Sequence, residues 1–524
     1  MSGASWVRSP VGVHAGRWAT LPGTRKVLFV VHTVTSANRL LDLVPLFDSD
    51  LRVQLVFTCP DASAIRGGVQ ECFAELGVLA IPWEQALHTE FDLAIAANHS
   101  GNLHELRAPL MIVSHGVGYS KNPPRTKIEE PRTYGLSAPW LLHEGHVVAD
   151  ALVLSHTEQL DRLRTSVPQA VPAAIVAGDP CLDRIRASRP LRERYRAALG
   201  VRPDQKLVVV SSTWSARSLF GSWPDLFRQL LAELPVDDYR VAAILHPHVW
   251  FGHGPHQVRL WLADCLRAGL TLVPPLEGWG AALVAADLVI GDAGATTTYG
   301  AALDRPVLLA AFPEEDVAQG SCVDVLGATA PRLDPGRSLR AQVDQTLAAF
   351  VPGALQKVTD LVSSYPDEAA IRLRARAYQL LDLPEPDHGV QVPPLRLEPS
   401  TKDEVTAYRV TTEFDASATV TVTRYPADVF RGRLLAEPSL ADPHLVVHAE
   451  HPDRALRSAA DIVFCRDEAQ TASLFDELDC YLVAVIAEDH CRVHLRDGRT
   501  IDHDGGDPLR FASELYAHLT TPPH

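Results

Sequence analysis

The chain has 524 residues, of which 46% are apolar and 21% charged, and its formal net charge at pH 7 is -16. This length exceeds what one hydrophobic core usually organises, so we expect about three domains of ordinary globular composition. The acidic balance, without a block of Lys and Arg, argues against a nucleic-acid partner, because affinity for a phosphate backbone comes from clustered basic side chains.

Residues 1–25, treated as an N-terminal extension, lack the basic start and continuous apolar stretch of a signal peptide. No later segment approaches the roughly 18 apolar residues that span a bilayer. We therefore expect a cytoplasmic protein without a transmembrane segment, and peripheral contact with a membrane stays open. Eight cysteines without a CxxC pair indicate reduced thiols in place of disulfides or zinc sites. The oligomeric state is not indicated.

The chain from residue 26 to residue 188 alternates short apolar runs with helical patterns. Residues 26–32 have no polar interruption until their end, which indicates a strand buried on both faces. Further strands are expected at residues 53–57, 92–96, 110–113, 151–154 and 174–176. This alternation predicts a Rossmann-like domain with a parallel sheet, whose ligands bind beyond the carboxyl ends of the strands.

A second domain of the same design is expected over residues 189–383. It begins with a charged helix at 191–199 and a buried strand at 206–212. Further strands are expected at residues 241–245, 270–273, 288–290 and 307–310, and a long amphipathic stretch at 355–381 closes the domain.

Four prolines mark a linker at residues 384–394, and residues 395–524 differ in character from the rest of the chain. Residues 419–423 alternate like a half-exposed strand, whereas 461–465 and 481–486 resemble core strands with helices around them. We interpret this segment as an accessory α+β domain without recognisable chemistry. The predicted fold class is α/β, with two Rossmann-like domains facing across a cleft.

One candidate site follows the strand at residues 110–113. His115 is placed to act as a general base, because an imidazole can accept a proton from a hydroxyl at neutral pH. Gly116 and Gly118 would allow a ligand to approach the backbone, and Lys121 could meet negative charge. A histidine and glycines at a strand end also suit an ordinary capped turn.

The second candidate site is His246-Pro247-His248, directly after another expected strand. One imidazole could contact a phosphate oxygen. Because Pro247 ends the strand, we expect one ligand contact and one structural histidine in preference to a shared metal site.

A cluster of small residues follows the strand at 288–290. Asp292, Gly294, Ala295, Thr296 and Thr297 precede an apparent helix, where free backbone amides and hydroxyls could hold a diphosphate. Plain helix capping is the alternative interpretation.

The end of the strand at 206–212 carries a further polar group. Thr213 and Arg217 could contact donor phosphate, while Trp214 suits a structural role at the interdomain hinge.

In this order and spacing the segments resemble the GT-B group that includes CDP-glycerol glycerophosphotransferases of teichoic-acid synthesis and, more distantly, UDP-N-acetylglucosamine 2-epimerases. The resemblance covers residues 26–383. His115-Gly116 with Lys121 is similar to the group's HG-x-x-x-K motif, with one extra residue before the lysine, and residues 212–214 are similar to its PTW motif. The other matching segments are residues 178–183, His246-Pro247, and residues 292–297 with 303–307. The resemblance implies that His115 is the base toward the acceptor and that His246 contacts donor phosphate.

The chain departs from the group at Thr298 and Tyr299, where relatives carry acidic residues that would bind ribose. Glu277, Glu314, Glu315 and Asp316 are alternative carboxylates in neighbouring loops. The departure argues against an epimerase.

The leading hypothesis is a metal-independent transferase, without a cofactor, that moves a glycosyl or glycerol-phosphate-type group from a nucleotide-diphosphate donor to a hydroxyl acceptor. Its catalytic residues would be His115 and His246. Its donor-binding residues would be Gly116, Lys121, Thr213, Arg217, His248, Asp292, Gly294, Ala295, Thr296 and Thr297. The alternatives are an inactive nucleotide- or sugar-binding module that recruits a partner, and a UDP-sugar 2-epimerase.

Overall fold

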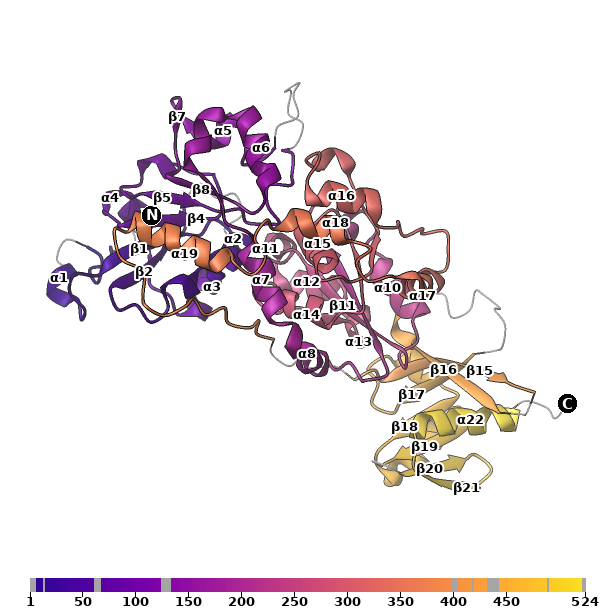
Figure 1. Cartoon of the computed structure of the whole chain (residues 1–524). Helices are drawn as coiled ribbons and strands as arrows, with labels where there is room; N and C mark the ends of the chain where they lie inside the picture. Colours follow the sequence, from indigo (N-terminus) through magenta and orange to yellow (C-terminus); the bar gives the residue numbers. More distant parts are fainter. Residues whose placement is uncertain are drawn as a thin grey trace.

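The computed structural model describes residues 6–12, 15–60, 67–123, 133–397, 404–416, 419–430, 443–487 and 490–520. They form two large α/β domains side by side and a smaller C-terminal domain attached to the second (Figure 1). In these ranges no helix combines the length and apolarity needed to cross a membrane.

The first domain is built on a seven-stranded sheet in the order β3-β2-β1-β4-β5-β8-β9, with every pair parallel. Its strands are β1 Arg25–Val30, β2 Val53–Thr58, β3 Ala80–Ile81, β4 Leu93–Ala96, β5 Leu110–Ile112, β8 Ala151–Leu154 and β9 Ala174–Val176. Along β1, Val27 and Phe29 enter one core cluster while Leu28 and Val30 enter the cluster on the opposite face. This burial on both faces confirms the expectation from the unbroken apolar run.

The helices of this part are α1 Ala15–Trp18, α2 Val34–Leu41, α3 Val69–Leu76, α4 Trp83–His88, α5 Ala138–Leu141 and α6 Thr157–Ser166. A hairpin of β6 Leu142–His143 and β7 His146–Val147 is added outside the main sheet. Sequence patterns missed this hairpin and β3, because two-residue strands carry no measurable periodicity.

The second domain has a five-stranded parallel sheet in the order β12-β11-β10-β13-β14. Its strands are β10 Lys206–Ser212, β11 Tyr239–Leu245, β12 Thr271–Leu272, β13 Leu288–Gly291 and β14 Val307–Leu309. The helices from the connection onward are α7 Pro180–Ala187, α8 Arg192–Ala198, α9 Leu219–Ser222, α10 Leu226–Glu233, α11 Pro247–His253, α12 Pro255–Trp261, α13 Ala263–Arg267, α14 Trp279–Ala285, α15 Ala295–Ala302, α16 Cys322–Thr329 and α17 Leu339–Ala349.

The amphipathic stretch expected at 355–381 is two helices, α18 Gln356–Val362 and α19 Ala369–Leu380. A proline at 366 and a positive φ at Asp367 separate them. The second helix places Leu373 and Tyr378 in the core of the first domain. This helix therefore belongs by packing to the first domain, although it lies within the range 189–383 predicted for the second.

The C-terminal domain holds a mixed sheet in the order β16-β15-β17-β18-β19-β20-β21. Its elements are β15 Ala407–Phe414, β16 Val420–Pro426, β17 His444–His448, α20 Arg454–Ser458, β18 Ile462–Cys465, α21 Thr471–Glu477, β19 Leu482–Ile486, β20 His490–Leu495, β21 Thr500–Asp504 and α22 Pro508–Thr520. Leu456 of α20 and Leu474 of α21 pack on one face of the sheet, and Ala512 of α22 packs on the other.

Both large sheets change direction at their centres. In the first, the chain runs outward from β1 to β3 and then from β4 to β9; in the second, β10 and β13 are the central pair. Ligands of open parallel sheets bind beyond the carboxyl ends of strands at such switch points. The segments after β1, β5, β10, β11 and β13 are thus where the fold places a site.

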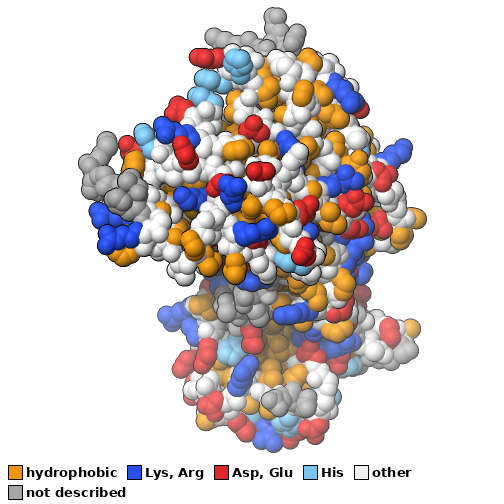
Figure 2. All heavy atoms as spheres, turned by 60° about the vertical axis from the view of Figure 1, so that its left-hand side comes forward, with side chains coloured by type: hydrophobic (Ala, Val, Ile, Leu, Met, Phe, Trp, Pro, Cys, Tyr) orange, Lys and Arg blue, Asp and Glu red, His pale blue; other side chains and the backbone are white. Residues whose placement is uncertain are grey.

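The surface seen in Figure 2 carries acidic and basic side chains interspersed with apolar ones, and the C-terminal domain forms a separate lower lobe. No large area of this face has a single sign of charge.

Candidate functional site

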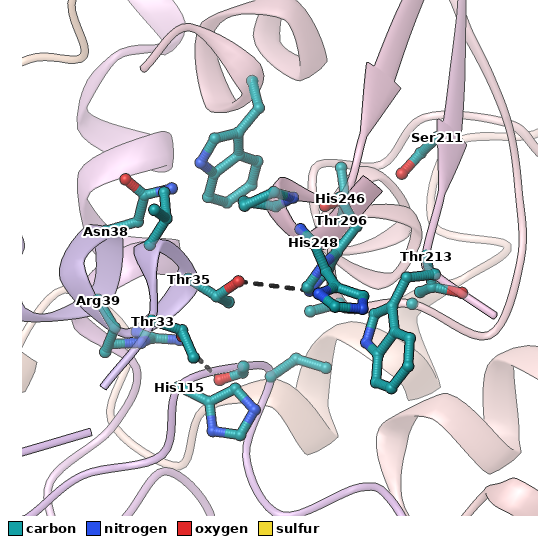
Figure 3. Close-up of a pocket in the computed structure, with 18 of the residues that line it drawn as sticks. Thr33, Thr35, Asn38, Arg39, His115, Ser211, Thr213, His246, His248 and Thr296 are labelled. Carbon is teal, nitrogen blue, oxygen red and sulfur yellow. Dashed lines mark hydrogen bonds between the residues drawn. The ribbon is translucent and has the colours of Figure 1, made fainter. Parts of the chain in front are cut away.

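A cavity of about 760 Å³ lies between the two large domains, at the carboxyl ends of both sheets. Residues after β1 and β5 line it from the first domain, and residues after β10, β11 and β13 line it from the second (Figure 3). Ten of the twelve residues predicted for the site line this one cavity: His115, Gly116, Lys121, Thr213, Arg217, His246, His248, Gly294, Ala295 and Thr296.

His115 lies just beyond β5, half-buried in the wall formed by the first domain. Burial, and to a smaller extent the positive charge of Arg39, lowers the pKa of His115 to about 4. A ring nitrogen hydrogen-bonds to the main chain of Ala97, which leaves the other nitrogen to accept a proton. The imidazole is therefore neutral near pH 7 and can act as a base.

The turn that carries His115 depends on Gly118. Its φ is +57°, and a Cβ at this position would lie 2.3 Å from Nε2 of Gln159. The Ser114 hydroxyl donates to the carbonyl of Gly118 over 2.6 Å and closes the turn. Gly118 is therefore required by its backbone conformation and by its packing, whether or not a ligand approaches it.

Lys121 crosses the cavity and donates a hydrogen bond to the carbonyl of Ala293 in the second domain. Burial lowers the pKa of the Lys121 ammonium. The predicted contact with donor phosphate would thus require the ammonium to share its hydrogens with this carbonyl.

The opposite wall is formed by the start of α15. Gly294 is the N-cap of this helix, and no side chain caps its first amides. Such amides and the helix dipole favour an anion. Ala295 and Thr296 line the cavity beside them.

Asp292 and Thr297 lie behind this wall, not in it. The Asp292 carboxylate accepts hydrogen bonds from the amide and hydroxyl of Thr213 and from the amide of Leu219, which fixes the loop after β10. The Thr297 side chain is fully buried against Gly291 of β13. Their side chains accordingly support the site predicted to bind the donor and do not reach the cavity.

His246 begins α11, and its Nδ1 accepts a hydrogen bond from the amide of His248 over 3.1 Å. Burial lowers the pKa of His246 to about 3, so the ring is neutral and its Nε2 carries the proton. This Nε2 faces the first domain, 3.4 Å from the hydroxyl of Thr35 (Figure 3). The His248 ring packs against the indole of Trp214, with centroids 4.5 Å apart. One histidine is thus a donor toward the cavity and the other packs at its rim.

Arg217 lies half-exposed at the rim and forms ion pairs with Glu315 and Asp316. The guanidinium that was predicted to balance phosphate is held by two of the carboxylates considered as ribose ligands.

The sequence patterns missed a group of polar residues at the N-cap and in the first two turns of α2. Thr33, Thr35, Asn38 and Arg39 line the cavity from the segment after β1. Thr33 caps the helix by accepting a hydrogen bond from the amide of Ser36. Their signal is positional: they follow the central strand of the first sheet, where the chain reverses its strand order.

Two Rossmann-like domains whose strands end at one shared cavity define the GT-B fold class, and the candidate site is the cleft between them. In the described part of the chain, no three His, Cys, Asp or Glu side chains gather in a way that would hold a metal ion.

Solved structures similar to this chain include the wall teichoic acid polymerase TagF, with 11% identity, a TM-score of 0.48, and coverage of 69% of this chain and 90% of that one. A UDP-GlcNAc 2-epimerase from Neisseria meningitidis has 12% identity, a TM-score of 0.43, and coverage of 68% and 99%. A glycosyltransferase from Rickettsia africae has 12% identity, a TM-score of 0.38, and coverage of 68% and 98%. These likenesses concern the course of the chain. No family model and no curated protein matches the sequence.

Proposed function

We propose that the protein is a transferase that moves a glycosyl or glycerol-phosphate-type group from a nucleotide-diphosphate donor to a hydroxyl acceptor. The observation that carries the proposal is the placement of a neutral imidazole, His115, in the same cavity as the uncapped amides of Ala295 and Thr296. A base on one wall and an anion site on the other are what transfer from a phosphate leaving group to a hydroxyl requires.

In the proposed reaction His115 removes the proton of the acceptor hydroxyl as its oxygen attacks the donor. The amides at the start of α15 and the Nε2 hydrogen of His246 stabilise the negative charge on the departing phosphate. Arg217 would join them only after leaving Glu315 and Asp316. These groups supply positive potential without a cation.

The test is turnover of CDP-glycerol and UDP-N-acetylglucosamine over a panel of hydroxyl acceptors, with His88→Ala as an exposed control. Attack at phosphorus releases the nucleoside monophosphate, and attack at the sugar carbon releases the diphosphate, so the product identifies the group transferred. We expect His115→Ala to lower kcat by about 100-fold or more. We expect His246→Ala to lower kcat/KM by about tenfold or more.

Two outcomes contradict the proposal. Nucleotide binding without turnover would favour a recognition module. The side chains of Thr298 and Tyr299 support this alternative, because both are bonded inside the protein: Thr298 donates to the carbonyl of Gly294, and Tyr299 to Asp179. Acceptor-independent release of UDP together with a 2-epimerised sugar would identify an epimerase.

A further inference from the structure

A buried polar cluster joins the two large domains beside the cavity. Arg39 of α2 and Asp179, the N-cap of α7, form an ion pair with Nη1 and Oδ1 3.1 Å apart. Tyr299 of α15 donates its hydroxyl hydrogen to Oδ2 of Asp179 over 2.8 Å and accepts a hydrogen bond from Nη2 of Arg39 over 2.7 Å. All three side chains are nearly or fully buried.

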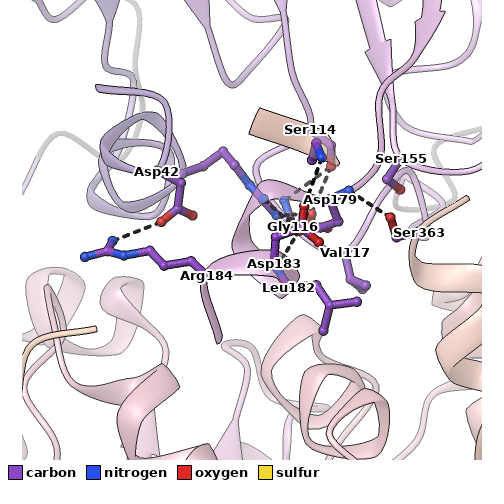
Figure 4. A network of polar contacts seen from close by, with 12 residues as sticks. Asp42, Ser114, Gly116, Val117, Ser155, Asp179, Leu182, Asp183, Arg184 and Ser363 are labelled. Carbon is purple, nitrogen blue, oxygen red and sulfur yellow. Dashed lines mark hydrogen bonds and ion pairs between the residues drawn. The ribbon is translucent and has the colours of Figure 1, made fainter. Parts of the chain in front are cut away.

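The same guanidinium reaches the loop that carries His115. Nη2 of Arg39 donates to the carbonyl of Gly116 over 2.7 Å. Figure 3 shows Arg39 near His115, and Figure 4 shows Gly116 beside Asp179. A single guanidinium therefore contacts the residue next to the candidate base and a residue of the opposite domain.

Tyr299 lies on the helix whose first turn forms the anion site. Gly294 is the N-cap of α15, and Tyr299 follows on the buried side of the same short helix. A short helix transmits position rigidly, because its backbone hydrogen bonds fix each residue relative to the next. Holding the Tyr299 hydroxyl therefore holds the amides at the helix start.

The contribution of Tyr299 to this junction can be divided into ring and hydroxyl. The ring packs beside Trp279 of its own domain, with centroids 5.8 Å apart. The hydroxyl alone bonds to Arg39 of the first domain and to Asp179 at the connection between the domains. Removing the oxygen leaves the ring packing intact and removes the hydrogen bonds of Tyr299 to Arg39 and Asp179. Other hydrogen bonds between the domains remain, among them Lys121 to Ala293 and Ala318 to Ser120.

We propose that Tyr299 is a positioning residue that sets the distance between His115 and the phosphate end of α15 by fixing the second domain to the Arg39–Asp179 pair. This inference rests on the proposed role of His115 as base. It assigns a purpose to Tyr299, whose hydroxyl makes a contact between the domains.

The test compares Tyr299→Phe with Tyr378→Phe. Tyr378 also donates its hydroxyl to an aspartate, Asp50, over 2.8 Å. Here, however, Tyr378 packs in the core of the first domain and Asp50 lies just before β2 of the same domain. Both variants lose a tyrosine–aspartate hydrogen bond and keep a ring of the same shape. Tyr299→Phe also loses the hydrogen bond from Arg39, which crosses between the domains.

The first measurement is the interdomain distance by pulsed electron paramagnetic resonance in the full chain. Spin labels at Leu51→Cys and Val351→Cys are suitable, because these side chains are 72% and 65% exposed and belong to different domains. Cys59→Ser removes the one native thiol that is not buried. We expect a longer, broader distribution for Tyr299→Phe and an unchanged one for Tyr378→Phe.

The second measurement is kinetic, with CDP-glycerol and UDP-N-acetylglucosamine as probe donors. For the donor that turns over, we expect Tyr299→Phe to lower kcat by about 10- to 100-fold while the donor KM changes less than about threefold, because the phosphate grip itself is untouched. A merely structural defect would instead lower the amount of folded protein. Tyr378→Phe controls for this effect, because it also loses a buried tyrosine–aspartate hydrogen bond.

Unchanged distances in Tyr299→Phe would overturn the inference, as would equal effects of the two variants. Should Tyr299→Phe fail to fold, Arg39→Lys gives the same comparison. An ammonium keeps the charge but lacks the two nitrogens by which Nη1 pairs with Asp179 while Nη2 contacts Gly116 and Tyr299. If neither donor turns over in the wild type, the proposed function fails, while the distance measurement still decides the interdomain link.

Discussion

Histidines gather around the cavity at the boundary of the two domains, and burial dominates their titration. It lowers the pKa of His32 and His115 to about 4 and that of His99 and His246 to about 3. In the unfolded chain these rings titrate near 6.5. Between pH 6.5 and pH 4 these histidines bind protons in the unfolded state but not in the folded state. The free energy of unfolding therefore falls as the pH falls through this window.

We predict that His99→Gln weakens this pH dependence. One buried histidine with a pKa of about 3 accounts for about 3 kcal/mol of the free energy of unfolding between pH 6.5 and pH 4. Urea denaturation at pH 7 and pH 4.5 measures the effect. The wild type and the exposed control His88→Gln should lose the same stability on acidification, and His99→Gln should lose less. An equal loss in all three proteins would contradict the assignment.

The sequence identified His115 and His246 because each directly follows a strand with a clear apolar run. The sequence could not show whether the side chains of Asp292 and Thr297 face the cavity or the protein interior. The same pattern of small and polar residues suits both orientations. The ion pairs of Arg217 with Glu315 and Asp316 join residues about a hundred positions apart, which no local pattern encodes.

At the scale of elements, the start of α15 is packed tightly against the loop after β10. A Cβ on Gly294 would lie 2.7 Å from Cγ2 of Thr213 and 3.0 Å from Oδ1 of Asp292. Any side chain would therefore push the helix start away from the loop after β10.

We predict that Gly294→Ala lowers the affinity for UDP and CDP by about tenfold or more, because the displaced amides no longer converge on the phosphates. Isothermal titration calorimetry measures it. Gly389→Ala is the matched control, since a Cβ there meets no atom within 4 Å. Identical affinities in the two variants would rule out the helix start as the anion site.

The large strands were predictable because a strand covered on both faces is apolar through its buried part, as residues 27–30 of β1 and 207–210 of β10 are. The break between α18 and α19 was not, although Pro366 lies within it. An amphipathic pattern on either side reads as one helix, and only the tertiary structure shows that the second half packs on a different domain.

At the scale of the molecule, the C-terminal domain is held to the second domain by buried charge. Arg424 of β16 pairs with Asp237 of the second domain and with Asp507 of its own domain. Arg267 of α13 donates to Asp428, which is fully buried, over 2.7 Å. Such contacts dock the domain in one orientation.

We predict that Arg424→Ala destabilises this docking by about 1–3 kcal/mol, because two partly buried carboxylates lose their partner. Scanning calorimetry should then show the C-terminal domain melting earlier than the rest. Arg492→Ala, which removes exposed ion pairs inside the same domain, should leave the profile unchanged. A profile unaltered by Arg424→Ala would mean that apolar contacts alone carry the interface.

The central claim is that a donor diphosphate lies at the start of α15, facing His115 across the cavity. The most direct test is a crystal structure of the full chain with CDP or UDP. We predict phosphate oxygens within hydrogen-bond distance of the amides of Ala295 and Thr296 and of Nε2 of His246, with His115 on the opposite wall. Nucleotide bound elsewhere, or no nucleotide bound at millimolar concentration, would contradict it.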